Sequence, residues 1–141
     1  MFNYRIRIII IIISMIIVFI LPYGYHVDLG PGPNGFMSIT WECPETESSP
    51  IPFSALEYFI YYLYRLVVLN AILKFSHGQM NMKRLIQHGI VGEIIPILIS
   101  IPGILFLNEE GENYIPIMIP IPFLLLFTLL LALYKYKVRN Y

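Results

Sequence analysis

The stretch LEYFIYYLYRLVVLNAIL, residues 56 to 73, is apolar over almost its whole length but carries Arg65 near its centre. A run of about 20 predominantly apolar residues is typical of a transmembrane helix. A charged side chain at the middle of a bilayer costs at least about 2.5 to 3.5 kcal/mol unless it is paired or hydrated. The stretch therefore predicts a membrane-spanning helix in which Arg65 faces protein.

The composition of the whole chain favours the same class of protein. Its 141 residues are 57% hydrophobic and 13% charged, with a mean hydropathy of +0.71, whereas an ordinary globular domain has about 25% charged residues. Backbone polar groups in lipid must find their hydrogen bonds within the segment itself, which favours helices. We expect an all-α integral membrane protein in which residues 1–141 form a single domain of four transmembrane helices. The four apolar runs are residues 6–22, 55–73, 89–107 and 115–134.

The charged residues predict how these helices are oriented. Eight of the nine basic residues flank the apolar runs on one side: Arg5, Arg7, Lys74, Lys83, Arg84, Lys135, Lys137 and Arg139. The two loops on the other side carry acidic residues and no basic ones. Cytoplasmic loops of membrane proteins are enriched in Lys and Arg. The sequence therefore predicts that both termini are cytoplasmic and that residues 23–54 form an extracytoplasmic loop.

This outer loop contains an alternating segment, FMSITWEC, residues 36 to 43. Strict alternation of apolar and polar residues is typical of a half-buried strand. We expect a partly ordered loop that lies over the mouth of the helices and contacts them through Trp41. Alternatively, the edge of this strand pairs with a strand of another protein.

Two helix faces are candidates for packing inside the bundle. On the second run, tyrosines and the arginine recur at i, i+3, i+4 and i+7, a spacing that places them on one face: Tyr58, Tyr61, Tyr62 and Arg65. On the third run, small and polar residues form a seam of the kind that lets helix backbones approach closely: Gly89, Glu93, Pro96, Ser100 and Gly103. We expect the tyrosine and arginine stripe to lie against this seam.

Glu93 is the obvious counter-ion for Arg65, but their depths differ. At 1.5 Å per residue, Arg65 lies about 13 Å and Glu93 about 7 Å above the inner boundary, and their side chains lean apart. Arg65 better suits Ser100, Tyr61, the carbonyl freed at Leu98 or a water pocket reaching Glu57; Glu93 better suits Asn70 or Lys74. These groups either lock the helix packing or line a polar pathway, and both interpretations remain open. The predicted intramembrane polar network comprises Arg65, Glu93, Glu57, Asn70, Ser100 and Tyr61.

Motifs for other chemistry are missing from the sequence. It contains no Gly-rich phosphate loop, nucleophile elbow or basic nucleic-acid surface, and we predict no catalytic residue, cofactor or nucleic-acid partner. The residues His26, Asp28, Glu42 and Cys43 lack the ligand spacing of a metal site. Cys43 is the only cysteine, so it has no partner for an internal disulfide.

These observations predict a small membrane protein that acts by association. It would be an accessory subunit of a larger membrane complex or a self-associating scaffold, with the lipid bilayer, other membrane subunits or itself as partners. The alternative is an oligomeric proton- or cation-coupled transporter or channel with Arg65, Glu93 and Glu57 along its path. A third possibility is a membrane-embedded enzyme that uses His26, Asp28 or Cys43 at the outer mouth.

Overall fold

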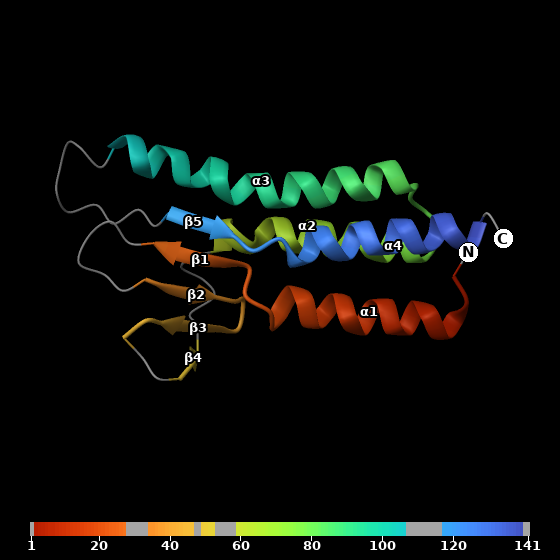
Figure 1. The fold of residues 1–141 in the computed structure, drawn as a ribbon, viewed down its shortest axis with the longest axis horizontal. Coiled ribbons are helices and arrows are strands. Elements are labelled where there is room, and N and C mark those ends of the chain that lie inside the picture. Colours follow the sequence, from red (N-terminus) through yellow and green to blue (C-terminus); the bar gives the residue numbers. More distant parts are fainter. Residues whose placement is uncertain (1, 28–33, 47–48, 53–58, 107–116, 140–141) are drawn as a thin grey trace.

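The part of the chain that the structure describes combines four helices with a five-stranded sheet. The computed structural model describes residues 2–27, 34–46, 49–52, 59–106 and 117–139. The helices lie side by side, the sheet occupies one end of the molecule, and both chain ends lie at the opposite end (Figure 1). In chain order the elements are α1 (Tyr4–Phe19), β1 (Gly24–Val27), β2 (Gly35–Met37), β3 (Trp41–Pro44), β4 (Ile51–Pro52), α2 (Phe59–Ser76), α3 (Met82–Phe106), β5 (Ile117–Pro120) and α4 (Phe123–Arg139).

The sheet joins the two halves of the chain. Its strand order is β4-β3-β2-β1-β5, and every neighbouring pair is antiparallel. The central strand β1 pairs Tyr25 with Phe36 of β2 on one side and with Ile119 of β5 on the other. Because β1 directly follows α1 and β5 directly precedes α4, this pairing fixes the end of α1 close to the start of α4.

The all-α prediction is wrong, and the local sequence explains where it failed. Residues 115–134 were expected to form one helix, but they contain strand β5 and only then α4, which begins at Phe123. Prolines at 116, 120 and 122 lack a backbone N–H and disfavour the helical conformation of the residue before them. Residues 23–54 likewise contain four strands instead of a loop over a helix bundle, and the segment 36–43 folds back between β2 and β3.

The prediction of a multi-pass integral membrane protein with cytoplasmic termini and a transmembrane four-helix bundle is also wrong. Among the residues described here, no helix is both long and apolar enough to cross a membrane. Helices α1 and α4 have 16 and 17 residues, whereas a span needs about 20. Helix α2 carries Arg65, Asn70 and Lys74 in its described part, and the first half of α3 contains Lys83, Arg84 and Glu93.

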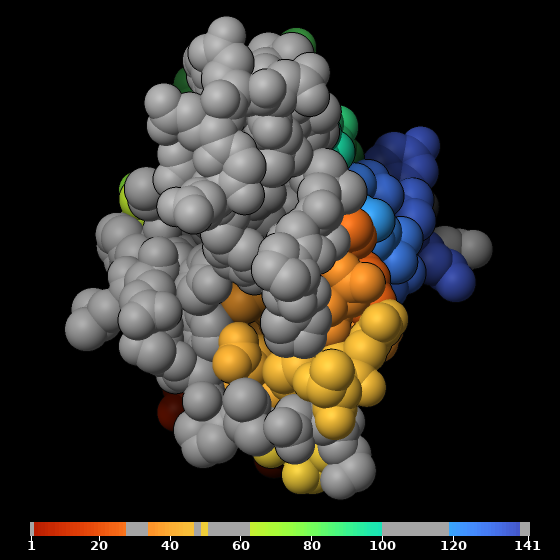
Figure 2. All heavy atoms as spheres, turned by 90° about the vertical axis from the view of Figure 1, so that its left-hand side faces the viewer, coloured from red at the N-terminus to blue at the C-terminus, as the bar shows by residue number. Residues whose placement is uncertain are grey.

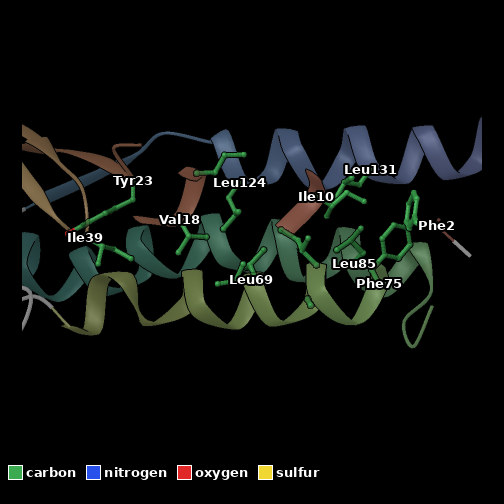
Figure 3. Packing of buried hydrophobic residues seen from close by; sticks show 14 of the residues in the cluster. Phe2, Ile10, Val18, Tyr23, Ile39, Leu69, Phe75, Leu85, Leu124 and Leu131 are labelled. Carbon is green, nitrogen blue, oxygen red and sulfur yellow. The ribbon is translucent and has the colours of Figure 1, made fainter. Parts of the chain in front are cut away.

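The hydrophobic core runs along the centre of the helices and continues beneath the sheet. Figure 3 shows buried side chains from all four helices pointing toward one another, with Tyr23 and Ile39 extending the core to the strands. At the end away from the sheet, the ring of Phe2 packs against those of Phe75 and Tyr134, with centroids 5.8 Å and 5.9 Å apart. These aromatic contacts hold the start of α1 against the ends of α2 and α4.

Helix α3 approaches its neighbours closely through two glycines. A Cβ atom on Gly92 would lie 2.7 Å from Cγ2 of Val68 and 3.3 Å from Cδ2 of Tyr64, both on α2. A Cβ atom on Gly89 would collide with the hydroxyl of Thr128 on α4. The predicted seam residue Gly89 therefore packs against α4, while Gly92, one residue before Glu93, makes the contact with α2.

Candidate functional site

The candidate site lies at the end of α1, where backbone carbonyls need hydrogen-bond donors from elsewhere. The last four carbonyls of a helix have no partner within the helix. The backbone N–H groups of Ile20 and Leu21 both donate to the carbonyl of Ile16, at 2.9 Å and 3.1 Å. The carbonyls of the following residues accept hydrogen bonds from side chains on α2 and the sheet.

Arg65 supplies one of these donors from α2. Its side chain is 0% exposed, and Nη1 donates to the carbonyl of Ile17 at 3.0 Å and, more weakly, to that of Leu21 at 3.5 Å. The ring of Tyr23 lies 5.5 Å from the guanidinium carbon. A helix C-terminus carries partial negative charge, and charge-assisted hydrogen bonds are stronger than neutral ones. The end of α1 is thus the main described stabiliser of this buried cation.

The sheet supplies the remaining donors. The hydroxyls of Ser38 and Thr40 both donate to the carbonyl of Phe19, each at 2.8 Å, and Nε1 of Trp41 donates to the carbonyl of Ile20 at 2.8 Å. All three donors come from the turn between β2 and β3 and from the first residue of β3. Trp41 therefore contacts the end of α1, and the turn holds this helix end against the sheet.

Glu93 has the complementary position at the start of α4. Its side chain is 8% exposed. Burial raises the pKa of this carboxyl, while the charge of Arg65 and a hydrogen bond from the backbone of Leu125 partly lower it. Leu125 lies in the first turn of α4, whose N–H groups have no partner in the helix and favour a negative charge. Glu93 therefore accepts a hydrogen bond at the start of α4, whereas Arg65 donates one at the end of α1.

Tyr64 lies close enough to both charged groups to be affected by their charges. It is 4% exposed, and its ring packs against Gly92 of α3. Burial raises the pKa of Tyr64 to about 12; the nearby charge of Arg65 opposes the shift and that of Glu93 adds to it. Tyr64, Arg65 and Glu93 thus form one group, the buried polar cluster, which contacts the end of α1 through Arg65 and the start of α4 through Glu93.

The other residues of the predicted network are placed differently. Asn70 is exposed on α2, and Pro96 is buried on α3. Glu57 lies outside the described residues, as do the side chains of Tyr61 and Ser100 and the packing around Gly103. The structure brings Arg65 and Glu93 into one cluster but leaves Asn70 out of it.

The partners that sequence reasoning missed lie far from Arg65 and Glu93 in the chain. They are Ile17, Tyr23 and Leu125. The donors Ser38 and Thr40, which bind the carbonyl of Phe19, were also missed. One signal was available, because Pro22 ends the first apolar run about a turn after Ile17 and thereby leaves carbonyls without helical donors. Nothing in the sequence indicated which side chains would reach those carbonyls.

The chemistry of the cluster suits it for holding helix ends in place. In the ranges that the structure covers, no three His, Cys, Asp or Glu residues come close enough to hold a metal ion. A tyrosine whose pKa is about 12 does not release its proton readily near neutral pH. Beside the cluster, an apolar groove of about 290 Å³ runs between α2 and α3, with Tyr64, Val68, Val91, Gly92 and Ile95 among the residues that line it.

No protein-family model, curated protein or solved structure matches this chain. Its function therefore has to be inferred from the geometry of the described residues.

Proposed function

We propose that this protein acts by association, packing the apolar outer faces of its helices against further helices. It would do so as a self-associating scaffold or as a subunit of a larger assembly. One observation carries the proposal, which is that large apolar side chains remain exposed along the outer faces of three helices. Figure 2, which looks onto the sheet end, shows α4 in blue along one flank of the strands.

The exposed residues form continuous stripes. Positions i, i+3, i+4 and i+7 share one helix face. Two helices expose large apolar side chains at this spacing, namely Ile9, Ile12, Ile13 and Ile16 on α1 and Leu126, Leu129, Leu130 and Leu133 on α4. Helix α3 exposes a similar set, Ile90, Val91, Ile94, Ile97 and Leu98. Ile12 is 53% exposed and Leu130 is 63% exposed, so packing within the chain leaves these stripes largely uncovered.

Such stripes favour association on energetic grounds. Contiguous apolar patches larger than a few hundred Å² are uncommon on monomeric proteins and usually mark interaction sites. Burying apolar surface contributes about 25 cal/mol per Å² removed from water. A helix packed along either stripe would bury several large side chains at once, whereas scattered exposed residues would give no such gain.

The experiment is to measure the assembly state of the purified full chain, by light scattering and chemical cross-linking. We expect species of more than one chain, and lower mass for the variant Ile9→Ser/Ile12→Ser/Ile16→Ser. The variant Gln87→Ser, at an exposed polar position, is the matched control and should leave the mass unchanged. A second polypeptide in fixed ratio identifies a subunit, and additional copies alone identify a scaffold. A lone monomer at every concentration, without co-purifying chains, would refute the proposal.

A further inference from the structure

The buried polar cluster contains more hydrogen-bonding capacity than the described residues use. Nε and Nη2 of Arg65 and Oε2 of Glu93 are enclosed and have no hydrogen-bond partner among the described residues. The Tyr64 hydroxyl is enclosed as well and has no partner at good hydrogen-bond geometry, although the Arg65 guanidinium lies close enough to lower its pKa. The side chains of Arg65, Tyr64 and Glu93 are 0%, 4% and 8% exposed, respectively. Buried polar groups in folded proteins are nearly always hydrogen-bonded to protein or to ordered water. A partner for these atoms is therefore needed inside the molecule.

The chemistry of the unpartnered atoms restricts what that partner can be. Arg65 can only donate hydrogen bonds, ionised Glu93 can only accept them, and the Tyr64 hydroxyl can do both. An anion would be repelled by Glu93, and a metal cation would be repelled by Arg65. A small neutral molecule that accepts and donates hydrogen bonds satisfies both groups, and a buried water typically makes about three hydrogen bonds of this kind.

We infer that the interior between Tyr64, Arg65 and Glu93 is a hydration site, in which ordered water accepts from the guanidinium and donates to the carboxylate. Tyr64 also lines the groove between α2 and α3, so this groove runs beside the hydration site.

The hydration site connects two parts of the fold. Arg65 holds the end of α1 through Ile17, and Glu93 holds the start of α4 through Leu125. Water between them joins both contacts into one hydrogen-bonded network. The end of α1 is followed by β1, and the start of α4 is preceded by β5. The network and the pairing of these two strands therefore reinforce each other.

An experimental structure of the full chain, at a resolution that shows ordered water, tests this inference. We expect density within about 3.2 Å of Nε or Nη2 of Arg65 and of Oε2 of Glu93, the usual range for such hydrogen bonds. Glu93→Gln should keep this density because its amide oxygen still accepts, and Glu93→Leu should lose it. A dry interior in which Nη2 of Arg65 contacts Oε2 of Glu93 directly would overturn the inference.

A measurement in solution provides a second test that does not depend on the Glu93→Leu variant folding. Tyr64→Phe and Glu93→Gln each alter one group around the water while keeping the shape of the side chain. If the water links them, the shift in Tm of the double variant differs from the sum of the single shifts. Additive shifts would overturn the assignment of a shared water to these two residues.

Discussion

Nη1 of Arg65 lies 3.0 Å from the carbonyl oxygen of Ile17, a residue 48 positions earlier in the chain. This contact joins a charge in the middle of α2 to the last turn of α1. It shows how the chain accommodates an arginine that is 0% exposed, because the helix end provides both an acceptor and a favourable partial charge. The arginine donates a hydrogen bond to a carbonyl of the last turn of α1, and the partial negative charge of that helix end stabilises the guanidinium.

Replacing Arg65 with methionine should destabilise the fold. The substitution keeps most of the side-chain volume but leaves the carbonyl of Ile17 without its donor, and a buried polar group left unsatisfied costs about 1 to 3 kcal/mol. The measurement is the free energy of unfolding in denaturant. Lys74→Met, at an exposed position of the same helix, serves as the control and should change this free energy by less than about 0.5 kcal/mol. Equal stability of the two variants would contradict the role assigned to Arg65.

Because Gly89 packs closely against Thr128, a larger residue at position 89 should destabilise the fold, and a smaller residue at position 128 should restore part of the stability. Gly89→Ala places a methyl group against the Thr128 hydroxyl, and overpacking of this kind typically costs about 1 to 3 kcal/mol. Thr128→Ala removes that hydroxyl, so the double variant should regain part of the lost stability. The readout is thermal unfolding of the two single variants and the double variant. Independent, additive losses would show that the two residues do not meet.

Glu93 predicts a particular dependence of stability on pH. Burial raises the folded-state pKa of this carboxyl above its ordinary value of 4.5, so the folded protein binds the proton more tightly than the unfolded chain does. The stabilising effect of that proton is complete below about pH 4.5 and is lost as the pH rises through the folded-state pKa. The Glu93→Gln variant has no such proton to lose, so its stability should not fall in this way. The free energy of unfolding of the variant, relative to that of the natural protein, should therefore increase with pH across that interval. Denaturant unfolding at several pH values measures the difference, and parallel curves would contradict the prediction.

The carbonyl of Phe19 accepts two hydrogen bonds from the sheet, so removing both donors should have a non-additive effect on stability. Ser38 and Thr40 both donate to the carbonyl of Phe19, so either single loss leaves one donor in place. Ser38→Ala or Thr40→Val alone should each lower the free energy of unfolding, measured in denaturant, by no more than about 1 kcal/mol. The double variant loses the last donor, so its free energy of unfolding should fall by more than the sum of the two single losses. Thr46→Val, at an exposed position after β3, is the control. A double variant no worse than the sum would mean that the carbonyl finds another donor.

Local patterns in the sequence located the helices but misjudged their ends. Each described helix overlaps one of the four apolar runs, because hydrophobicity and internal hydrogen bonding act between near neighbours. Arg65, Glu93 and Trp41 also stood out, since each is conspicuous against the residues beside it. The prolines at 116, 120 and 122 were visible too, but the apolar residues around them led to the prediction of a continuous helix.

By itself, then, the sequence determined where helices form and which polar side chains have to be accommodated among apolar ones. The tertiary structure alone decided that residues 117–120 become a strand, because β5 needs β1 from the other end of the chain as its partner. It also decided that Arg65 meets Ile17 and that Glu93 meets the start of α4. Strand pairing and the capping of helix ends depend on groups that are distant in sequence, and such partners become neighbours only when the chain folds.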